Sequence, residues 1–334
     1  QSNIGFDLTF ANNHFTINAD YFNKSVDGLL FTPSASLYLG TVPIPQANIG
    51  TTKSSGFDVT LNYRNSPNKK VQFNSSLTFT TATNEVTSTN SDGTAKILGG
   101  NYFNGQSQSV TVFEKGFAPG YFYGYKTAGL FQNAADIAAS AKQAGAQPGD
   151  IKYVDMNGDG VINASDQTNI GNPFPKFTMG WSFNLSYKNF DFNTFLYASV
   201  GNDIYRAYER NANFSNKDRS VLGRWTGEGT TNDARLPRYS FVDANSNIRV
   251  SDRYVEDGSF LKIKNIQLGY TFNTPASKKW FNSIRVYAQV KNAFVFTKYT
   301  GFDPEIAGGI LDTGIDRGAY PQARTFAFGF DIKL

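Results

Sequence analysis

The stretch KFTMGWSFNLSYK, residues 176–188, alternates apolar residues with small or polar ones. Its apolar positions are Phe177, Met179, Trp181, Phe183, Leu185 and Tyr187. Because successive side chains of a β-strand point to opposite faces, a period of two residues puts all of them on one face. The stretch therefore predicts a strand with one apolar face and one polar face.

The same alternation recurs along the chain, and we expect about eleven strands of this kind. The clearest repeats begin at Ile4, Phe15, Phe57, Val71, Ile284 and Phe326. The weakest lie around 106–113 and 121–132. Strands of about ten residues or more are long for a soluble sheet, but they match a tilted crossing of a bilayer.

Short and long connections alternate between these predicted strands. The short ones fall near 12–13, 65–69, 114–120, 188–189 and 273–281, and the long ones near 24–51, 84–106, 133–175, 206–257 and 298–321. Every long connection then lies at the same end of the strands. A transmembrane barrel has this arrangement, with short periplasmic turns, long extracellular loops, a lipid-facing apolar band and a polar lumen. We therefore predict an all-β protein, a transmembrane antiparallel β-barrel.

Composition agrees with this fold class and excludes several others. Phe (30) and Tyr (18) are abundant, as is usual in strands. The absence of Cys excludes disulfides and thiol catalysis. Acidic and basic residues are interspersed at a net charge of +4, so no basic tract indicates a nucleic-acid partner. No apolar run approaches the roughly 18 residues of a transmembrane helix.

The strand count leads to an expectation about the rest of the protein. If the last strand ends in the periplasm, eleven strands place the start of this chain on the extracellular side. A complete single-chain bacterial barrel has an even number of strands. We therefore expect residues 1–334 to be the second part of a larger barrel.

The long connection over 133–175 contains a possible metal site, DMNGDGVINASD at residues 155–166. Oxygen donors occupy positions 1, 3, 5, 7, 9 and 12 of an EF-hand-type loop: Asp155, Asn157, Asp159, Val161, Asn163 and Asp166. The spacing predicts a structural calcium ion, and the alternative is an Asx-rich turn that binds no metal. A calcium sensor is disfavoured because no amphipathic helices flank the loop and position 12 is Asp.

The connection over 206–257 mixes aromatic residues with arginines. Stacking faces and forked donors of this kind bind sugars or peptides. The candidate substrate-binding residues are Tyr208, Arg210, Arg224, Trp225, Arg238 and Tyr239. The alternative is that these aromatics pack the loops together or form the interfacial girdle of a barrel. His14 is the only histidine, and no Ser-His-Asp set, HExxH or phosphate loop is present, so we expect no catalytic residue.

Several segments carry a family resemblance. They are GYFYGYKTAGLFQ (120–132), the run from DMNGDGVINASD to FLYASVGNDIY (155–205), VEDGSFLKIKNIQLGYTF (255–272), RVYAQVKNAFVFTKYTGFDPEI (285–306) and YPQARTFAFGFDIKL (320–334). In this order they resemble the C-terminal part of SusC/RagA-type TonB-dependent outer-membrane transporters of the Bacteroidota.

The resemblance implies a 22-stranded barrel, a size found in plugged transporters, with about the last eleven strands supplied here. It also implies a place in the outer membrane, a SusD-like surface lipoprotein as partner and nutrient uptake of oligosaccharides or peptides. The TonB complex would act through a plug, but neither the plug, a TonB-contacting segment nor an N-terminal carboxypeptidase-like domain is recognisable in this chain. The alternative is a soluble calcium-stabilised β adhesin or carbohydrate-binding module.

Overall fold

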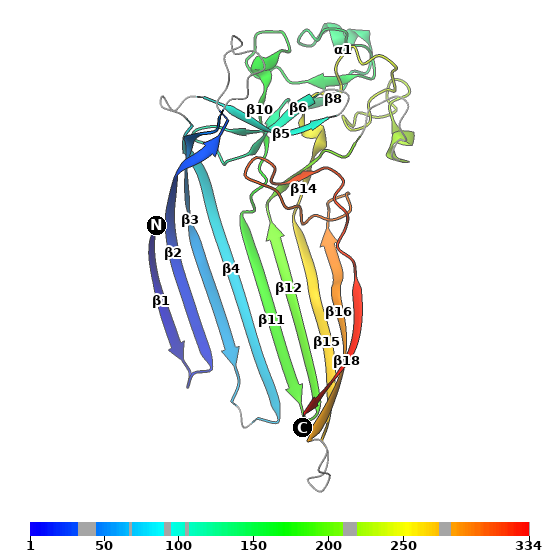
Figure 1. The fold of residues 1–334 in the computed structure, drawn as a ribbon. Helices are drawn as coiled ribbons and strands as arrows, with labels where there is room; N and C mark the ends of the chain where they lie inside the picture. Colours follow the sequence, from blue (N-terminus) through cyan, green and yellow to red (C-terminus); the bar gives the residue numbers. More distant parts are fainter. Residues whose placement is uncertain are drawn as a thin grey trace.

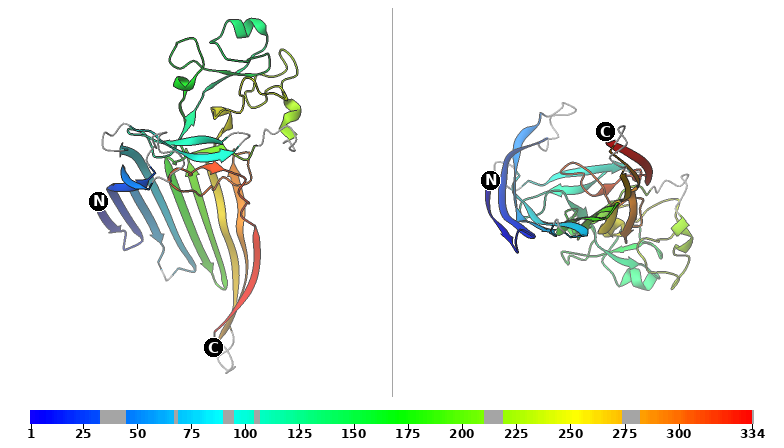
Figure 2. Two further views of the ribbon diagram at one scale, coloured as in Figure 1. Left: turned by 45° about the horizontal axis from the view of Figure 1, so that its top comes forward. Right: turned by 90° about the horizontal axis from the view of Figure 1, so that it is seen from below.

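The computed structural model describes residues 1–32, 45–66, 69–89, 95–103, 107–209, 219–273 and 282–333. Nine long strands form one antiparallel sheet in the order β1-β2-β3-β4-β11-β12-β15-β16-β18. Their bounds are β1 Ser2–Phe10, β2 Phe15–Phe31, β3 Ala47–Arg64, β4 Val71–Ser88, β11 Phe177–Tyr187, β12 Phe190–Val200, β15 Phe260–Asn273, β16 Ser283–Thr297 and β18 Thr325–Lys333. The sheet is a curved wall with β1 and β18 at its two edges (Figure 2, right).

The long connections gather at one end of this sheet and form what we call the cap (Figure 1). It comprises the described residues within 97–171, 203–257 and 299–317. Its elements are β5 Ile97–Phe103, β6 Ser107–Phe113, β7 Tyr121–Gly124, β8 Thr127–Leu130, α1 Ala134–Ala138, β9 Ile151–Tyr153, η2 Ala164–Asp166, β10 Thr168–Gly171, β13 Asp203–Arg206, η3 Arg219–Gly223, η4 Asp252–Tyr254, β14 Val255–Asp257 and β17 Ile315–Asp316. None of the described helices is long and apolar enough to cross a membrane.

One face of the nine-stranded sheet is apolar throughout. A single row of facing residues crosses seven strands: Leu8, Ile17, Leu61, Leu77, Trp181, Leu196 and Ile263. Large side chains stand exposed on this face, among them Phe328 (84%) and Phe330 (70%). So extended an apolar surface would be unfavourable in water but suits contact with lipid.

The opposite face is polar and forms the lumen wall. Amide side chains link β11, β12, β15 and β16: Asn193 donates to Asn184 (2.5 Å), Asn265 to Asn193 (2.7 Å) and Gln289 to Asn265 (2.7 Å). Nearer the C-terminal edge, the Arg285 guanidinium of β16 donates to a carboxylate on the neighbouring β18 and to one on β12, two strands away.

Those two ion pairs are short. Arg285 reaches Asp191 of β12 at 2.6 Å and Asp331 of β18 at 3.0 Å. Since these polar side chains pair with partners on other strands, the lumen face keeps its register without an apolar core.

The expected number of strands was wrong. Two predicted membrane strands, around 106–113 and 121–132, belong instead to the cap, where β6 and β7 pair with β5 and β10 in a separate sheet. Successive residues Val110, Thr111, Val112 and Phe113 are all fully buried. An apolar run of this kind is covered on both faces by protein, and sequence patterns do not distinguish it from one that faces lipid.

The turn at 114–120 therefore joins two cap strands and is not periplasmic. The nine observed strands, like the eleven expected, are an odd number. The start of β1 therefore still lies on the cap side, opposite to the end of β18 (Figure 1). The connection over 133–175 contains α1, β9, η2 and β10 and is a folded part of the cap.

A charged side chain should destabilise the protein much more on the apolar face of the sheet than on the polar face. In the whole barrel, Leu61→Arg in the lipid-facing row should lower the free energy of unfolding by about 2 to 4 kcal/mol. The matched variant Thr60→Arg places the same side chain on the lumen face, beside Asp58, and should change it by less than about 1 kcal/mol. Urea titration in lipid vesicles measures both values; equal losses would contradict the assignment of the faces.

Candidate functional site

The calcium-type loop lies in the cap between β9 and β10 and folds around its own carboxylates. The Asp155 side chain accepts hydrogen bonds from the backbone N–H groups of Gly158 (2.7 Å) and Gly160 (2.8 Å). Both glycines have positive φ, +76° and +81°, which an L side chain would strain. The fully buried Asp166 accepts from Met156 N–H (2.9 Å) and Asn163 N–H (2.7 Å) and closes the loop.

The remaining donors show how far this loop fits a cation. The Val161 N–H bonds to the Asp159 carboxylate at 2.8 Å, and this bond, together with Asn157, holds the pKa of Asp159 below its usual value. Asp159 therefore stays anionic at neutral pH. Across the described residues, no three His, Asp or Glu side chains converge as a metal cluster. Calcium binding remains a prediction, carried by the loop spacing, the half-buried Asp155 and the exposed Asp159.

The six predicted substrate-binding residues do not form one site. Trp225 and Arg238 both pack against Gly149, whose added Cβ would lie 2.3 Å from the indole and 2.8 Å from Arg238. Tyr208 lies elsewhere, near Gly318, and Tyr239 meets Phe241 edge to face (5.8 Å between ring centroids). Arg224 donates from its backbone to Val221, while Arg210 lies outside the described residues.

Trp225 and Arg238 have structural roles in the cap. The indole packs on a buried cluster made of Tyr125, Leu130, Ile151, Tyr153 and Ile162. The Arg238 guanidinium donates to the fully buried Asp150 at 2.7 Å. For these two residues the structure favours the alternative in which the loop residues pack the loops together.

A buried amide network missed by the sequence analysis surrounds Asp150. Its carboxylate also accepts from Asn247 (3.0 Å) and from Gln147 N–H (2.9 Å). Gln143 donates to the Ile151 carbonyl (2.9 Å) and to Asn245 (2.8 Å). The available signal was the asparagine-rich run at 245–247, but such runs are usually exposed turns.

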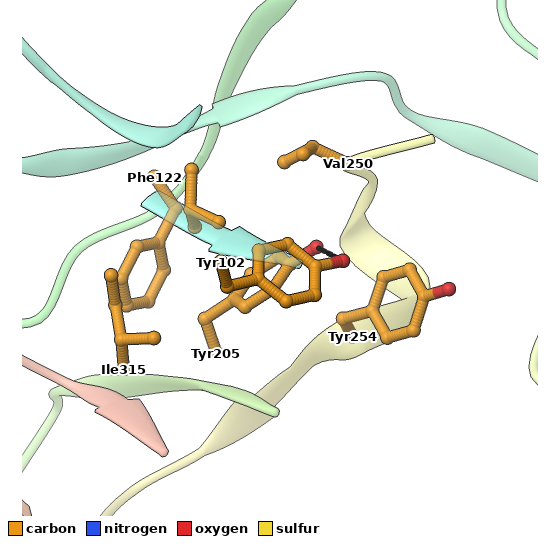
Figure 3. Close-up of a cluster of buried hydrophobic side chains, with 7 residues drawn as sticks. Tyr102, Phe122, Tyr205, Val250, Tyr254 and Ile315 are labelled. Carbon is orange, nitrogen blue, oxygen red and sulfur yellow. Dashed lines mark hydrogen bonds between the residues drawn. The ribbon is translucent and has the colours of Figure 1, made fainter. Parts of the chain in front are cut away.

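An aromatic cluster holds separate elements of the cap together (Figure 3). Its buried members are Tyr102, Val110, Phe122, Tyr205, Val250, Tyr254 and Ile315. They come from β5, β6, β7, β13, η4 and β17, and the Tyr102 and Tyr205 hydroxyls are 3.2 Å apart. Burial raises the pKa of Tyr205 well above its ordinary value, so the hydroxyl stays protonated. Segments from three long connections thus share one core.

A second link runs from β15 to the loop after β16. Lys262 is 2% exposed and donates to Asp303 (2.6 Å) and Glu305 (2.9 Å). Burial alone would raise the pKa of Asp303, but the ammonium of Lys262 outweighs this and holds the pKa below its usual value. The ion pair fixes the position of this loop at the mouth of the sheet.

An open polar cleft of about 450 Å³ lies in the cap between β8, residues 232–235 and η4. Asp252 on its wall accepts hydrogen bonds from the backbone and hydroxyl of Thr127. Arg235 forms an exposed pair with Asp233 at 2.8 Å. Side chains of both charges and Asn232 therefore line a space that could hold hydroxyl, amide or carboxylate groups of a ligand.

Comparisons with known proteins identify relatives of one kind, although no family model matches the chain. TonB-dependent receptor P3 of Formosa agariphila is 31% identical over 350 residues, covering 100% of this chain and 34% of that protein. TonB-dependent receptor SusC of Bacteroides thetaiotaomicron is 29% identical over 339 residues, covering 99% and 31%. The chain thus spans about a third of the length of these relatives.

Solved structures agree on the fold. The structure of the RagAB peptide transporter superposes with a TM-score of 0.76 at 21% sequence identity, covering 99% of this chain and 34% of that chain. The RagAB peptide importer in its open-open state gives a TM-score of 0.72 at 22% identity. The sheet and cap therefore have the fold of an outer-membrane barrel transporter.

The Arg238–Asp150 pair predicts a local loss of stability. Arg238→Ala leaves a buried carboxylate without its cation, which should destabilise the cap by about 3 kcal/mol. Arg235→Ala removes the same side chain from the exposed pair with Asp233 and should cost less than about 1 kcal/mol. Amide hydrogen exchange of residues 143–153 measures the effect, and similar exchange in the two variants would contradict the structural role of Arg238.

Proposed function

Because this chain belongs to the SusC/RagA-type TonB-dependent receptors of the bacterial outer membrane, we propose that it forms the C-terminal wall and the extracellular cap of a nutrient importer. Its substrates would be oligosaccharides or peptides. The observation that carries this proposal is the two-faced sheet with the described parts of the long connections gathered at one end. An apolar outer face and a polar inner face suit a solvated path through a membrane, and they do not suit the soluble adhesin considered as the alternative.

A surface lipoprotein of the SusD type is the proposed extracellular partner. The family resemblance supports it, and so does the character of the cap surface. Leu222, Phe241 and Val242 are 72–80% exposed there, and apolar side chains gathered on an otherwise polar surface are typical of protein contacts. The TonB complex would supply energy through the plug domain of the receptor.

The class of substrate follows less directly from the chain. The RagAB structures are of a peptide transporter, whereas SusC is named only as a TonB-dependent receptor. The polar cleft at Asn232 and Asp252 and the amide-lined lumen wall offer donors and acceptors that serve either sugars or peptides. No group in either place favours a catalytic role.

Uptake by intact cells tests the function. A strain lacking the receptor should lose energy-dependent uptake of fluorescent peptides or oligosaccharides, and the full-length gene should restore it. Removing TonB should abolish the restored uptake, while passive entry of a small porin substrate serves as the control. If uptake of both classes is the same with and without the receptor, the proposed function is wrong.

We also propose a structural calcium ion at 155–166. Asp155 and Asp159 would supply carboxylates and Val161 its carbonyl. Bound calcium would stiffen the connection between β9 and β10. The loop lies beside the apolar core of the cap, since Ile162 belongs to that core and Lys142 pairs with Val161.

Thermal unfolding of the whole receptor tests the ion. EDTA should lower the melting temperature of the parent, and calcium should restore it, because the ion binds only the folded loop. Asp155→Ala with Asp159→Ala should lower the melting temperature in calcium and remove the EDTA effect. Asp233→Ala, an exposed acid elsewhere in the cap, should keep that effect. A parent that does not respond to EDTA would rule out the site.

A further inference from the structure

The lipid-facing side of β12, β15, β16 and β18 carries an apolar groove of about 510 Å³. Its walls include Phe190, Leu268, Tyr270, Val286, Phe328 and Phe330. Phe190, Tyr270, Val286 and Phe330 face one another in a single row across the four strands. Because this row begins next to the short turn at 188–189, the groove lies at the periplasmic end of the sheet.

Side-chain size explains why the outer surface is hollow there. In the neighbouring row, Ala288 stands between Leu268 and Phe328. Small residues on β16 thus lie between larger ones on β15 and β18. Leu268, which is 53% exposed, forms one ridge, and Phe328 forms the other. A narrow apolar channel between ridges fits a hydrocarbon chain.

A cation stands beside the groove on the same face. Lys188 forms the β11–β12 turn, and its ammonium lies 5.3 Å from the ring centroid of Tyr187. Tyr187 is opposite Phe190 and on the apolar face, so this contact places the Lys188 charge on the outer side of the wall. Among the described residues no carboxylate lies within ion-pair distance of Lys188.

We propose that the groove and Lys188 hold one anionic phospholipid of the periplasmic leaflet. An acyl chain would lie along Val286 and Ala288, and the phosphate would meet the Lys188 ammonium. Aromatic rings lie between the groove and Lys188. Tyr270 meets both Phe190 and Phe272 edge to face, with ring centroids 4.7 Å apart in each pair. Tyrosine at this depth is typical of a membrane interface.

Charge decides which lipid is favoured. A lysine near an anionic membrane surface contributes about 1 kcal/mol, and here no protein carboxylate competes for it. A headgroup with net negative charge should therefore bind about fivefold more tightly than a zwitterionic one with the same acyl chains. The site requires the membrane position of the sheet, but it does not depend on which nutrient the receptor imports.

Lipid binding to the full-length receptor complex tests the proposal. Native mass spectrometry during titration with phosphatidylglycerol or phosphatidylethanolamine of matched acyl chains should show the preference for phosphatidylglycerol in the parent. Lys188→Asn should remove that preference, about fivefold. Asn accepts the positive φ of 53° at this turn without strain. Lys70→Asn, at the β3–β4 turn away from the groove, is the matched control and should keep the preference.

A second variant tests the groove itself. Ala288→Phe fills the channel and should weaken retention of both lipids, whereas Val59→Phe adds the same ring to the lipid face of β3 and should not. Unchanged binding in Lys188→Asn or in Ala288→Phe would overturn the proposal, as would a second protein copy in place of the bound lipid. Nutrient uptake is measured separately, so a failure here is distinguishable from a failure of the import function.

Discussion

Backbone hydrogen bonding in lipid is the constraint on which this structure depends. Inside a bilayer no water can satisfy a free N–H or C=O group, so a chain crosses it with strands only when each strand pairs with its neighbours. The long antiparallel pairings of neighbouring strands, which run across the sheet from β1 to β18, meet this need over most of each strand. The pairing also fixes which residues share a face, and therefore where lipid, water and the cap meet the chain.

The backbone groups of the cap also need hydrogen-bond partners, but many of these partners are side chains. Its strands are only two to seven residues long, so side chains satisfy many of the backbone groups. Asp166 and Asp155 accept the N–H groups of one loop, and Asp150 anchors another. The buried tyrosines Tyr102, Tyr205 and Tyr254 then pack the short elements of the cap against one another. A folded cap of this kind can present a fixed surface to a substrate or partner.

The sequence pattern by itself determined those features of the fold that depend only on the two-residue period of a strand. The alternation at 176–188 predicted β11 and its apolar face, and the alternation of short and long connections predicted the end at which the cap lies. Both follow because a strand in a half-polar environment must repeat every two residues. Pattern failed at β6 and β7, where protein covers both faces. It also did not reveal the packing of Trp225 and the ion pair of Arg238 within the cap.

Tertiary structure alone decided the contacts between residues far apart in the chain. Lys188 faces lipid because its turn directs it over Tyr187, and the groove beside it exists because Ala288 lies between ridges from two other strands. Asp150 meets Arg238 across 88 positions. Local sequence dictates the face on which a side chain lies, since that depends on the backbone period. Which partner it meets depends on how distant strands and loops pack, and that is fixed only when the whole sheet and cap have folded.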